Sequence, residues 1–259
     1  MVDFTFRRSI FRIREMAFVK YTDVARKSCD VLYLHSSDND LSKAPRKSHS
    51  KLQYTLINDL LSTEEELLGK VKKNCKYEIR RAEKEGAITC IYSDKHDFET
   101  NEVINKFKKV YNVMFKAKDL DYYFNEDLSL AGIEAKQLVV TTNALSSDPD
   151  CVVYHAYLVD GTSAVLMYSA SPLWEDGDKE KANAIGRLNK NLHWKDMLWF
   201  KGNGYSRYEW GGISNPDELN GIDRFKAEFG GELACYVNYL IPCSILGRIY
   251  VSLVKKREK

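Results

Sequence analysis

The chain has 259 residues, enough for one large domain or two small ones. Hydrophobic residues make up 44% and charged residues 29%, which is ordinary for a globular protein and argues against extended disorder. The 39 Lys and Arg against 37 Asp and Glu leave a net charge of +2, which is too small to argue for nucleic-acid binding from bulk charge. Any basic surface that binds a partner must therefore be local.

Cysteine and histidine spacing gives no sign of a metal site. The 6 cysteines lack CxxC spacing and the 5 histidines lack HxxxH or HxH spacing. Scattered cysteines fit free thiols in a reducing compartment. We expect no metal, no disulfide framework and no tightly bound cofactor.

The first residues, MVDFTFRRSIFRIREMAF, are basic and amphipathic, but arginines interrupt every apolar stretch, so no signal-peptide core is present. No window approaches the roughly 20 apolar residues that a membrane span needs. We expect a cytoplasmic protein, and weak contact with a membrane surface stays open.

Residues 1–60 predict no clear elements, whereas the chain from Ser62 to Gly86 predicts one helix. It opens with a Ser-x-x-Glu capping box and carries Leu67, Leu68 and Val71 on one side. Its second half is basic from Lys70 to Arg81. Cations there either complement the helix dipole or form a binding patch.

The next elements follow from periodicity. Residues 87–93 predict a strand, and two helices follow, the second over roughly 127–145. Two apolar runs joined at Asp160-Gly161 predict a hairpin. Residues 181–200 predict a long buried helix.

The last part of the chain alternates strand and helix. RYEWGGI predicts a strand, GIDRFKAEFGG a short helix, ELACYVNYLIP another strand, and Ile245, Ile249 and Leu253 mark a final helix. This order predicts an α/β (α+β) fold, a mixed sheet with helices on both faces.

The segment from Tyr205 to Gly231 is where chemistry is most plausible, because no GxSxG elbow, phosphate loop or GxGxxG fingerprint occurs. On a helical wheel, one apolar stripe contains Ile222, Phe225 and Phe229. Lys226 lies at its edge, whereas Asp223 and Arg224 point elsewhere. Lys226 is then either a partly desolvated amine facing a cleft or a side chain whose stem covers the core.

The preceding strand alternates. Tyr208 and Trp210 are expected on one face, and Arg207 and Glu209 on the other. Tyr208 and Trp210 are either core residues or substrate contacts. Gly211 and Gly212 either form a plain turn or let the backbone approach a ligand closely.

The segments GNGYSRYEWGGI and GIDRFKAEFGG, with KNCKYEIRRAEKEG upstream, resemble the FemABX-like aminoacyl transferases of the GNAT acyltransferase superfamily. The resemblance covers roughly Ser62 to Pro242. It implies a GNAT-like mixed sheet that splays where the acyl donor enters. It also implies a GNAT-like domain over residues 61–259, preceded by an extension, residues 1–60, that is the remnant of a first GNAT-like half.

The resemblance also implies direct attack of an amine on an activated carbonyl. Lys226 would stabilise the developing oxyanion and Phe225 would support it. Relatives often carry Asp where this chain has Glu209, so a base or orienting role for Glu209 stays open. Implied contacts to donor or acceptor are Arg80, Arg81, Tyr208, Trp210, Gly211, Gly212 and Arg224.

The chain lacks the Q/R-x-x-G-x-G/A pattern that binds the acetyl-CoA pyrophosphate in ordinary GNAT enzymes. The resemblance leaves aminoacyl-tRNA and acyl-CoA as donors. The acceptor would be an amine, on a sugar or peptide precursor of the cell envelope. The alternative is a non-catalytic GNAT-fold module whose residues 70–81 bind RNA or an anionic lipid-linked or nucleotide sugar. The sequence does not predict the oligomeric state.

Overall fold

The computed structural model describes residues 1–24, 28–36, 40–119, 123–174 and 178–257. Within them the strands are β1 (Val2–Arg8), β2 (Phe11–Val19), β3 (Val31–Ser36), β4 (His49–Asp59), β5 (Ala87–Tyr92), β6 (Leu138–Leu145), β7 (Asp148–Val159), β8 (Ser163–Ala170), β9 (Arg207–Glu209) and β10 (Glu232–Pro242). The helices are α1 (Glu64–Lys70), α2 (Lys73–Lys84), α3 (Lys95–Asn101), α4 (Val103–Ala117), α5 (Glu126–Glu134), α6 (Lys179–Gly202), α7 (Gly221–Ala227) and α8 (Ile245–Arg257). None of these helices is long and apolar enough to cross a lipid bilayer.

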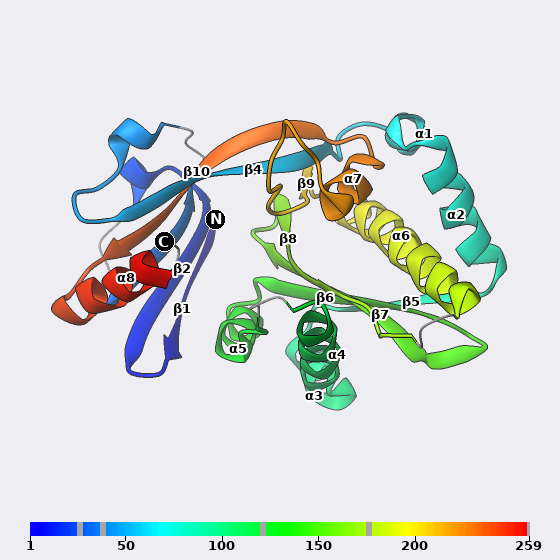
Figure 1. Cartoon of the computed structure of the whole chain (residues 1–259), viewed down its shortest axis with the longest axis horizontal. Helices are drawn as coiled ribbons and strands as arrows, with labels where there is room; N and C mark the ends of the chain where they lie inside the picture. The colour runs from blue at the N-terminus through cyan, green and yellow to red at the C-terminus, as the bar shows by residue number, and fades with distance from the viewer. Residues whose placement is uncertain (25–27, 37–39, 120–122, 175–177, 258–259) are drawn as a thin grey trace.

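All strands belong to one ten-stranded sheet in the order β1-β2-β3-β10-β4-β9-β8-β7-β6-β5. The pairs β2/β3 and β8/β9 are parallel, whereas the other neighbours are antiparallel. The long strands β4 and β10 arch between the two groups of strands (Figure 1). The predicted mixed sheet is confirmed.

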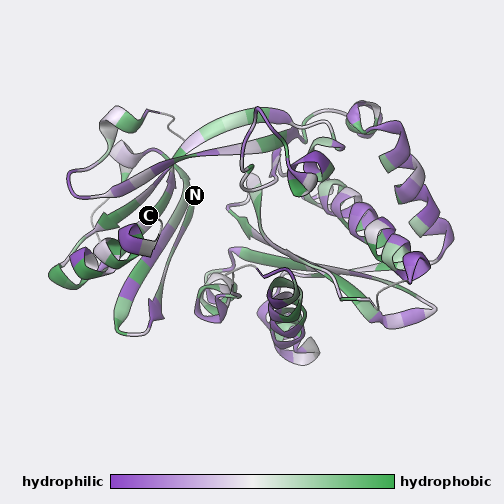
Figure 2. Cartoon of the chain, viewed as in Figure 1, coloured by the Kyte–Doolittle hydropathy of each residue, from purple (hydrophilic) through white to green (hydrophobic). Residues whose placement is uncertain are grey.

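Helices cover both faces of the larger strand group, as predicted. α6 packs on β5, β6 and β7 and also contacts α2, while α4 and α5 contact β8 and β6 from the opposite side (Figure 1). The side of α2 that faces away from α6 is strongly hydrophilic (Figure 2).

The strands of residues 1–60 share a core with the rest of the chain. Val2, Phe4 and Phe6 alternate along β1 and are buried in one cluster with Phe107 of α4 and Leu128 of α5. The predicted boundary after residue 60 follows β4 directly, and both the sheet and this core cross it.

The predicted helix over residues 62–86 is wrong in its continuity and its cap. Thr63, not Ser62, forms the capping box with Glu66. The helix breaks because Val71 is buried in extended backbone and the Lys72 amide donates to the Glu228 carbonyl oxygen at 2.8 Å. α2 therefore starts afresh at Lys73.

The predicted helix over residues 127–145 is also wrong. α5 ends at Glu134, Lys136 adopts φ 55°, and β6 begins at Leu138. The run LVVTTNAL is rich in β-branched residues, which favour a strand, and it is buried between β5 and β7. The apolar residues keep a helical spacing across the turn at Lys136, so periodicity alone does not show where the helix ends.

The expected splay lies between β8 and β9. These strands pair over only three positions, the last being Val165 with Glu209. β9 also pairs with β4, and beyond Glu209 only this second pairing continues, since Trp210 and Ile213 donate backbone hydrogen bonds to Leu56 and Tyr54. The predicted strand over 207–213 is thus only Arg207–Glu209 in β9.

Asn58 of β4 ties this splayed segment to the end of α7. Its Oδ1 accepts from Trp210 Nε1 at 2.7 Å and its Nδ2 donates to the Phe229 carbonyl at 3.0 Å. Asn58 is 3% exposed, so water cannot replace either partner.

We expect Asn58→Ala to lower the free energy of unfolding by about 3 kcal/mol, because it leaves two buried polar groups unpaired. Urea unfolding followed by tryptophan fluorescence measures this change. The exposed Asn105→Ala on α4 is the control, with an expected change near zero. Equal stability of both variants would contradict the structural role of Asn58.

Candidate functional site

The loop before α7 is fixed by a small hydrogen-bond network. The Asn220 side chain caps α7 by accepting from the Asp223 amide at 2.9 Å. Asp223 accepts in turn from the Ser214 amide at 3.1 Å and from the Ser214 hydroxyl. The sequence predicted that Asp223 points away from the core, but it is buried because it holds this loop.

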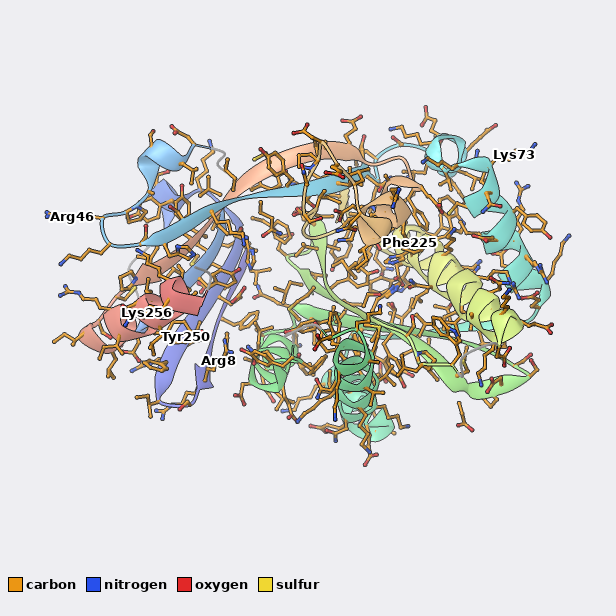
Figure 3. The ribbon with its side chains drawn as sticks, viewed as in Figure 1. Arg8, Arg46, Lys73, Phe225, Tyr250 and Lys256 are labelled. Atoms are coloured by element: carbon orange, nitrogen blue, oxygen red, sulfur yellow. The ribbon has the colours of Figure 1, made fainter. Side chains whose placement is uncertain are left out.

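The apolar side of α7 also differs from its prediction. Ile222 is 56% exposed, whereas Phe229 is fully buried and Phe225 is half-buried. Phe225 packs between α7 and α6 against His193 and Trp210 (Figure 3). Ile222 therefore lies outside the core, whereas Phe225, one turn later on α7, contacts His193 of α6.

Lys226 lies at the border of this aromatic cluster. Its Nζ donates to the Gly212 carbonyl oxygen at 2.6 Å. Burial lowers the pKa of Lys226 from 10.5 to about 8, although the charge of Asp223 opposes this shift. The amine thus sits partly desolvated beside the backbone that leaves β9 at the splay. Arg224 is exposed on the same helix.

Gly211 and Gly212 sit at the parting of the strands. Gly211 has φ +68°, and a Cβ there would lie 2.6 Å from the Leu166 carbonyl oxygen of β8. Glycine is required at this position for both reasons. The backbone approaches β8 closely before the two segments separate.

An ion-pair junction holds α7 against its neighbours. Lys190 of α6 contacts Glu78 of α2 at 2.5 Å and Glu228, just after α7, at 2.6 Å. The Lys190 amine also lies 5.8 Å from the Phe225 ring centroid. Three helices therefore converge on the segment that carries Lys226.

Beneath the aromatic cluster lies a buried polar chain that the sequence did not predict. His193 Nδ1 lies 2.7 Å from the Tyr208 hydroxyl, which lies 2.8 Å from the Tyr157 hydroxyl. Tyr157 donates to Asp196 Oδ2 at 2.5 Å. His155 Nδ1 lies 2.8 Å from the same oxygen.

The electrostatics of this chain favour the neutral forms of His193, Tyr157 and Tyr208. Burial lowers the pKa of His193 well below its usual value, and the electrostatic effects of His155 and Lys226 act in the same direction. Burial and the charge of Asp196 raise the pKa of Tyr157 and Tyr208 well above theirs. Asp196 Oδ1 is buried without a partner among the described residues. Tyr208 is therefore a core residue whose hydroxyl links Tyr157 to His193 by hydrogen bonds.

His155, His193 and Asp196 also bring possible ligand atoms within 4.8 Å of one another. The two imidazole rings, however, lie nearly stacked, with centroids 3.9 Å apart and an interplanar angle of 27°. In-plane lone pairs of stacked rings run side by side and do not converge on one ion. The geometry of these three side chains is that of a hydrogen-bonded network, not that of a metal site.

Glu209 lies on the opposite face of the sheet from Tyr208, as the alternation predicts. Its carboxylate lies 3.2 Å from Arg207 Nη2, which also contacts the Tyr236 hydroxyl. Burial raises the pKa of Glu209, although the charges of Arg207 and His35 oppose the shift. The structure does not bring Glu209 beside Lys226. The two occupy opposite faces at the splay.

Arg80 and Arg81 lie elsewhere, on the exposed face of α2 (Figure 3 labels Lys73 on the same helix). Arg81 Nε donates to Glu85 Oε1 at 2.8 Å. A hollow of about 490 Å³ is lined by Lys73, Lys76, Tyr77, Arg80, Arg81 and Lys84. This basic face is continuous and solvent-accessible.

No family model matches the sequence, and no curated protein does. Solved structures do match in fold. FemX is 14% identical with a TM-score of 0.50, over 79% of this chain and 65% of FemX. The chain thus spans less than two thirds of FemX.

A second match is the C-terminal domain of a protein described as a lysylphosphatidylglycerol synthetase from Agrobacterium fabrum. It is 11% identical with a TM-score of 0.55, over 86% of this chain and 71% of that one. A GCN5-related N-acetyltransferase-like protein from Streptococcus suis is 11% identical with a TM-score of 0.38, over 91% and 81%. The fold is therefore similar to that of FemX and of this C-terminal domain.

We expect the Lys226 amine to become half deprotonated near pH 8. Because folding lowers this pKa, the unfolded chain binds more protons between about 8 and 10.5, and stability relative to Lys226→Met rises with pH across that interval. Competitive acetylation with mass spectrometry measures the titration directly, with exposed Lys109 as internal reference. A titration of Lys226 close to 10.5 would contradict its desolvation.

Proposed function

We propose that this protein is an N-acyltransferase that moves an aminoacyl or acyl group from an activated donor to an amine. The observation that carries this proposal is the position of Lys226, a partly desolvated amine at the point where β9 leaves β8 in a FemX-like fold. Fold similarity at this identity supports the architecture alone, so the activity rests on the site.

The reaction needs only positioning and one charge. The acceptor nitrogen attacks the carbonyl carbon, the carbonyl oxygen becomes an oxyanion, and collapse expels the donor's oxygen or sulfur while nitrogen loses its proton. With a pKa of about 8, Lys226 is mostly protonated at neutral pH. Its Nζ would exchange the Gly212 carbonyl for the stronger oxyanion acceptor.

At the splay, a bound substrate would be reached by side chains from both faces of the sheet. A carbonyl seated beyond the Val165–Glu209 pair would meet Lys226 on the face of α6 and Glu209 on the other. A raised pKa suits Glu209 for accepting the proton of the incoming amine. Phe225 would hold Lys226 through its packing on His193 and Trp210.

Aminoacyl-tRNA is the donor we favour over acyl-CoA. The name of one structural neighbour, lysylphosphatidylglycerol synthetase, describes an aminoacyl product, and the pyrophosphate-binding pattern of acetyl-CoA enzymes is missing. The exposed cations of α2, with Arg224 on α7, would contact donor phosphates. An amine on an envelope precursor is the proposed acceptor, and the cytoplasm the proposed location.

We expect Lys226→Met to slow acyl transfer about a hundredfold while the protein stays folded, because one preorganised donor to the oxyanion is lost. The assay is transfer of isotope-labelled acyl groups from acyl-CoAs or charged tRNAs to a mixture of amine acceptors. Lys109→Met, which removes an exposed amine of α4, is the matched control. Full activity of Lys226→Met would remove Lys226 from the mechanism.

The second candidate function is a non-catalytic binding module, and the basic hollow on α2 favours it. Exposed Tyr77 lies among five cations there, a combination that suits stacking of a base between phosphate contacts. Such a module would bind RNA or an anionic sugar conjugate and transfer nothing.

This alternative predicts strongly salt-dependent binding. We expect Lys73→Ser with Arg80→Ser to weaken binding of a short single-stranded RNA and to reduce the slope of log affinity against log salt by about 1.4, or about 0.7 for each cation. Fluorescence anisotropy measures both. Lys106→Ser with Lys109→Ser on α4 is the control and should change neither. RNA binding without any acyl transfer from any donor would favour this function over the first.

A further inference from the structure

Helix α8 exposes an apolar stripe although its other side is already buried. Gly247 and Val251 face the sheet, where α8 packs on β10, β2 and β3. The outward residues Ile245, Leu246, Ile249 and Leu253 are 75%, 41%, 51% and 52% exposed. A helix that is apolar on both sides needs a second apolar partner.

Cations surround this stripe. Arg248 and Lys256 are exposed on α8 and line, with Ile249 and Leu253, a shallow hollow of about 350 Å³. Lys255 Nζ donates to the Ser48 carbonyl at 2.9 Å. This hydrogen bond ties the loop that carries the exposed Arg46 and Lys47 to α8, although Arg46 itself points away from the helix (Figure 3).

The hairpin between β1 and β2 extends the same surface. Arg8 Nη1 donates to the Tyr250 hydroxyl at 3.0 Å, and the Phe11 ring lies 5.0 Å from that of Tyr250. Ile10, at the tip, is 67% exposed. The exposed cations Arg7 and Arg12 flank it across the hairpin.

The acidic group at the start of α8 is already engaged. Asp30 accepts from the Ser244 hydroxyl at 2.6 Å and from the Arg12 amide at 2.9 Å. These hydrogen bonds, with the charges of Arg12 and Arg7, lower the pKa of Asp30. Asp30 keeps its negative charge, but the exposed Arg7, Arg12, Arg248 and Lys256 outnumber it, so the rim of the stripe has a net positive charge.

We propose that this face, called here the α8 face and made of α8 with the β1–β2 tip, binds the surface of an anionic phospholipid bilayer. The apolar side chains would enter the region between headgroups and acyl chains, while the rim cations contact phosphates. A second copy is disfavoured as the occupant, since a two-fold contact would set the cationic rims against each other.

This inference does not depend on the acyl-transfer proposal. In Figure 1, α8 lies at the left end of the molecule and α2 at the right end, with α6 and α7 to the right of the centre, so a bilayer bound at α8 would leave the Lys226 site uncovered. Lipid binding and acyl transfer can therefore fail separately.

The test is co-sedimentation of the full chain with vesicles of phosphatidylcholine alone or of equal parts phosphatidylcholine and phosphatidylglycerol. We expect binding to the anionic vesicles only. Ile249→Glu with Leu253→Glu should reduce it at least tenfold, and Arg248→Ser with Lys256→Ser roughly tenfold. Because these positions are exposed, we expect the variants to stay folded, and circular dichroism checks this.

Matched controls remove the same chemistry elsewhere. Leu61→Glu with Leu130→Glu, and Lys106→Ser with Lys109→Ser, should bind like the unchanged chain. Lack of anionic-vesicle binding by the unchanged chain would overturn the proposal. So would loss of binding on Lys73→Ser with Lys76→Ser of α2, or a dimer in light scattering that Ile249→Glu with Leu253→Glu dissolves.

Discussion

The short parallel contact between β8 and β9 is the constraint on which the site depends. After Glu209 the pairing with β8 ends and the pairing with β4 continues, while Gly211 lies close to the Leu166 carbonyl. If β9 continued along β8, Gly212 would lie inside the sheet and Lys226 would have no carbonyl to contact. Asn58 holds the segment after β9 in place, because its side chain hydrogen-bonds both Trp210 and Phe229. These hydrogen bonds therefore determine where the sheet opens between β8 and β9.

The core under this opening contains polar side chains that form one hydrogen-bonded chain. The hydroxyls of Tyr157 and Tyr208 connect Asp196 to His193, which packs against Phe225 and Trp210. Such a network specifies one arrangement of α6 against the sheet, because any other leaves buried groups unpaired. An all-apolar core would tolerate sliding of α6. Rigidity beneath α7 is what a preorganised charge requires.

Sequence patterns predicted the parts of this protein that are governed by local periodicity. The hairpin at Asp160-Gly161, the long helix α6 and the strand β10 appeared with nearly correct bounds. Periodicity failed where tertiary bonds decide, as at Lys72, whose amide pairs with Glu228, far away in sequence. It failed for Asp223, because the loop that this carboxylate holds folds back onto α7. His155 and His193 could not be found together, since nothing in their spacing reveals that β7 and α6 stack their rings.

The position of β10 has a consequence for how the chain is made. This strand follows all the other described strands in the sequence yet lies between β3 and β4, so β1, β2 and β3 join the rest of the sheet only after β10 has been synthesised. Until then β3 and β4 keep unpaired backbone groups along one edge, and β1 to β3 can form only a separate small sheet. Late closure by sequence-distant pairing is slow and leaves the nascent chain open to wrong strand partners. Pairing of β10 with β3 and β4 is therefore the step that must occur before the ten-stranded sheet is complete.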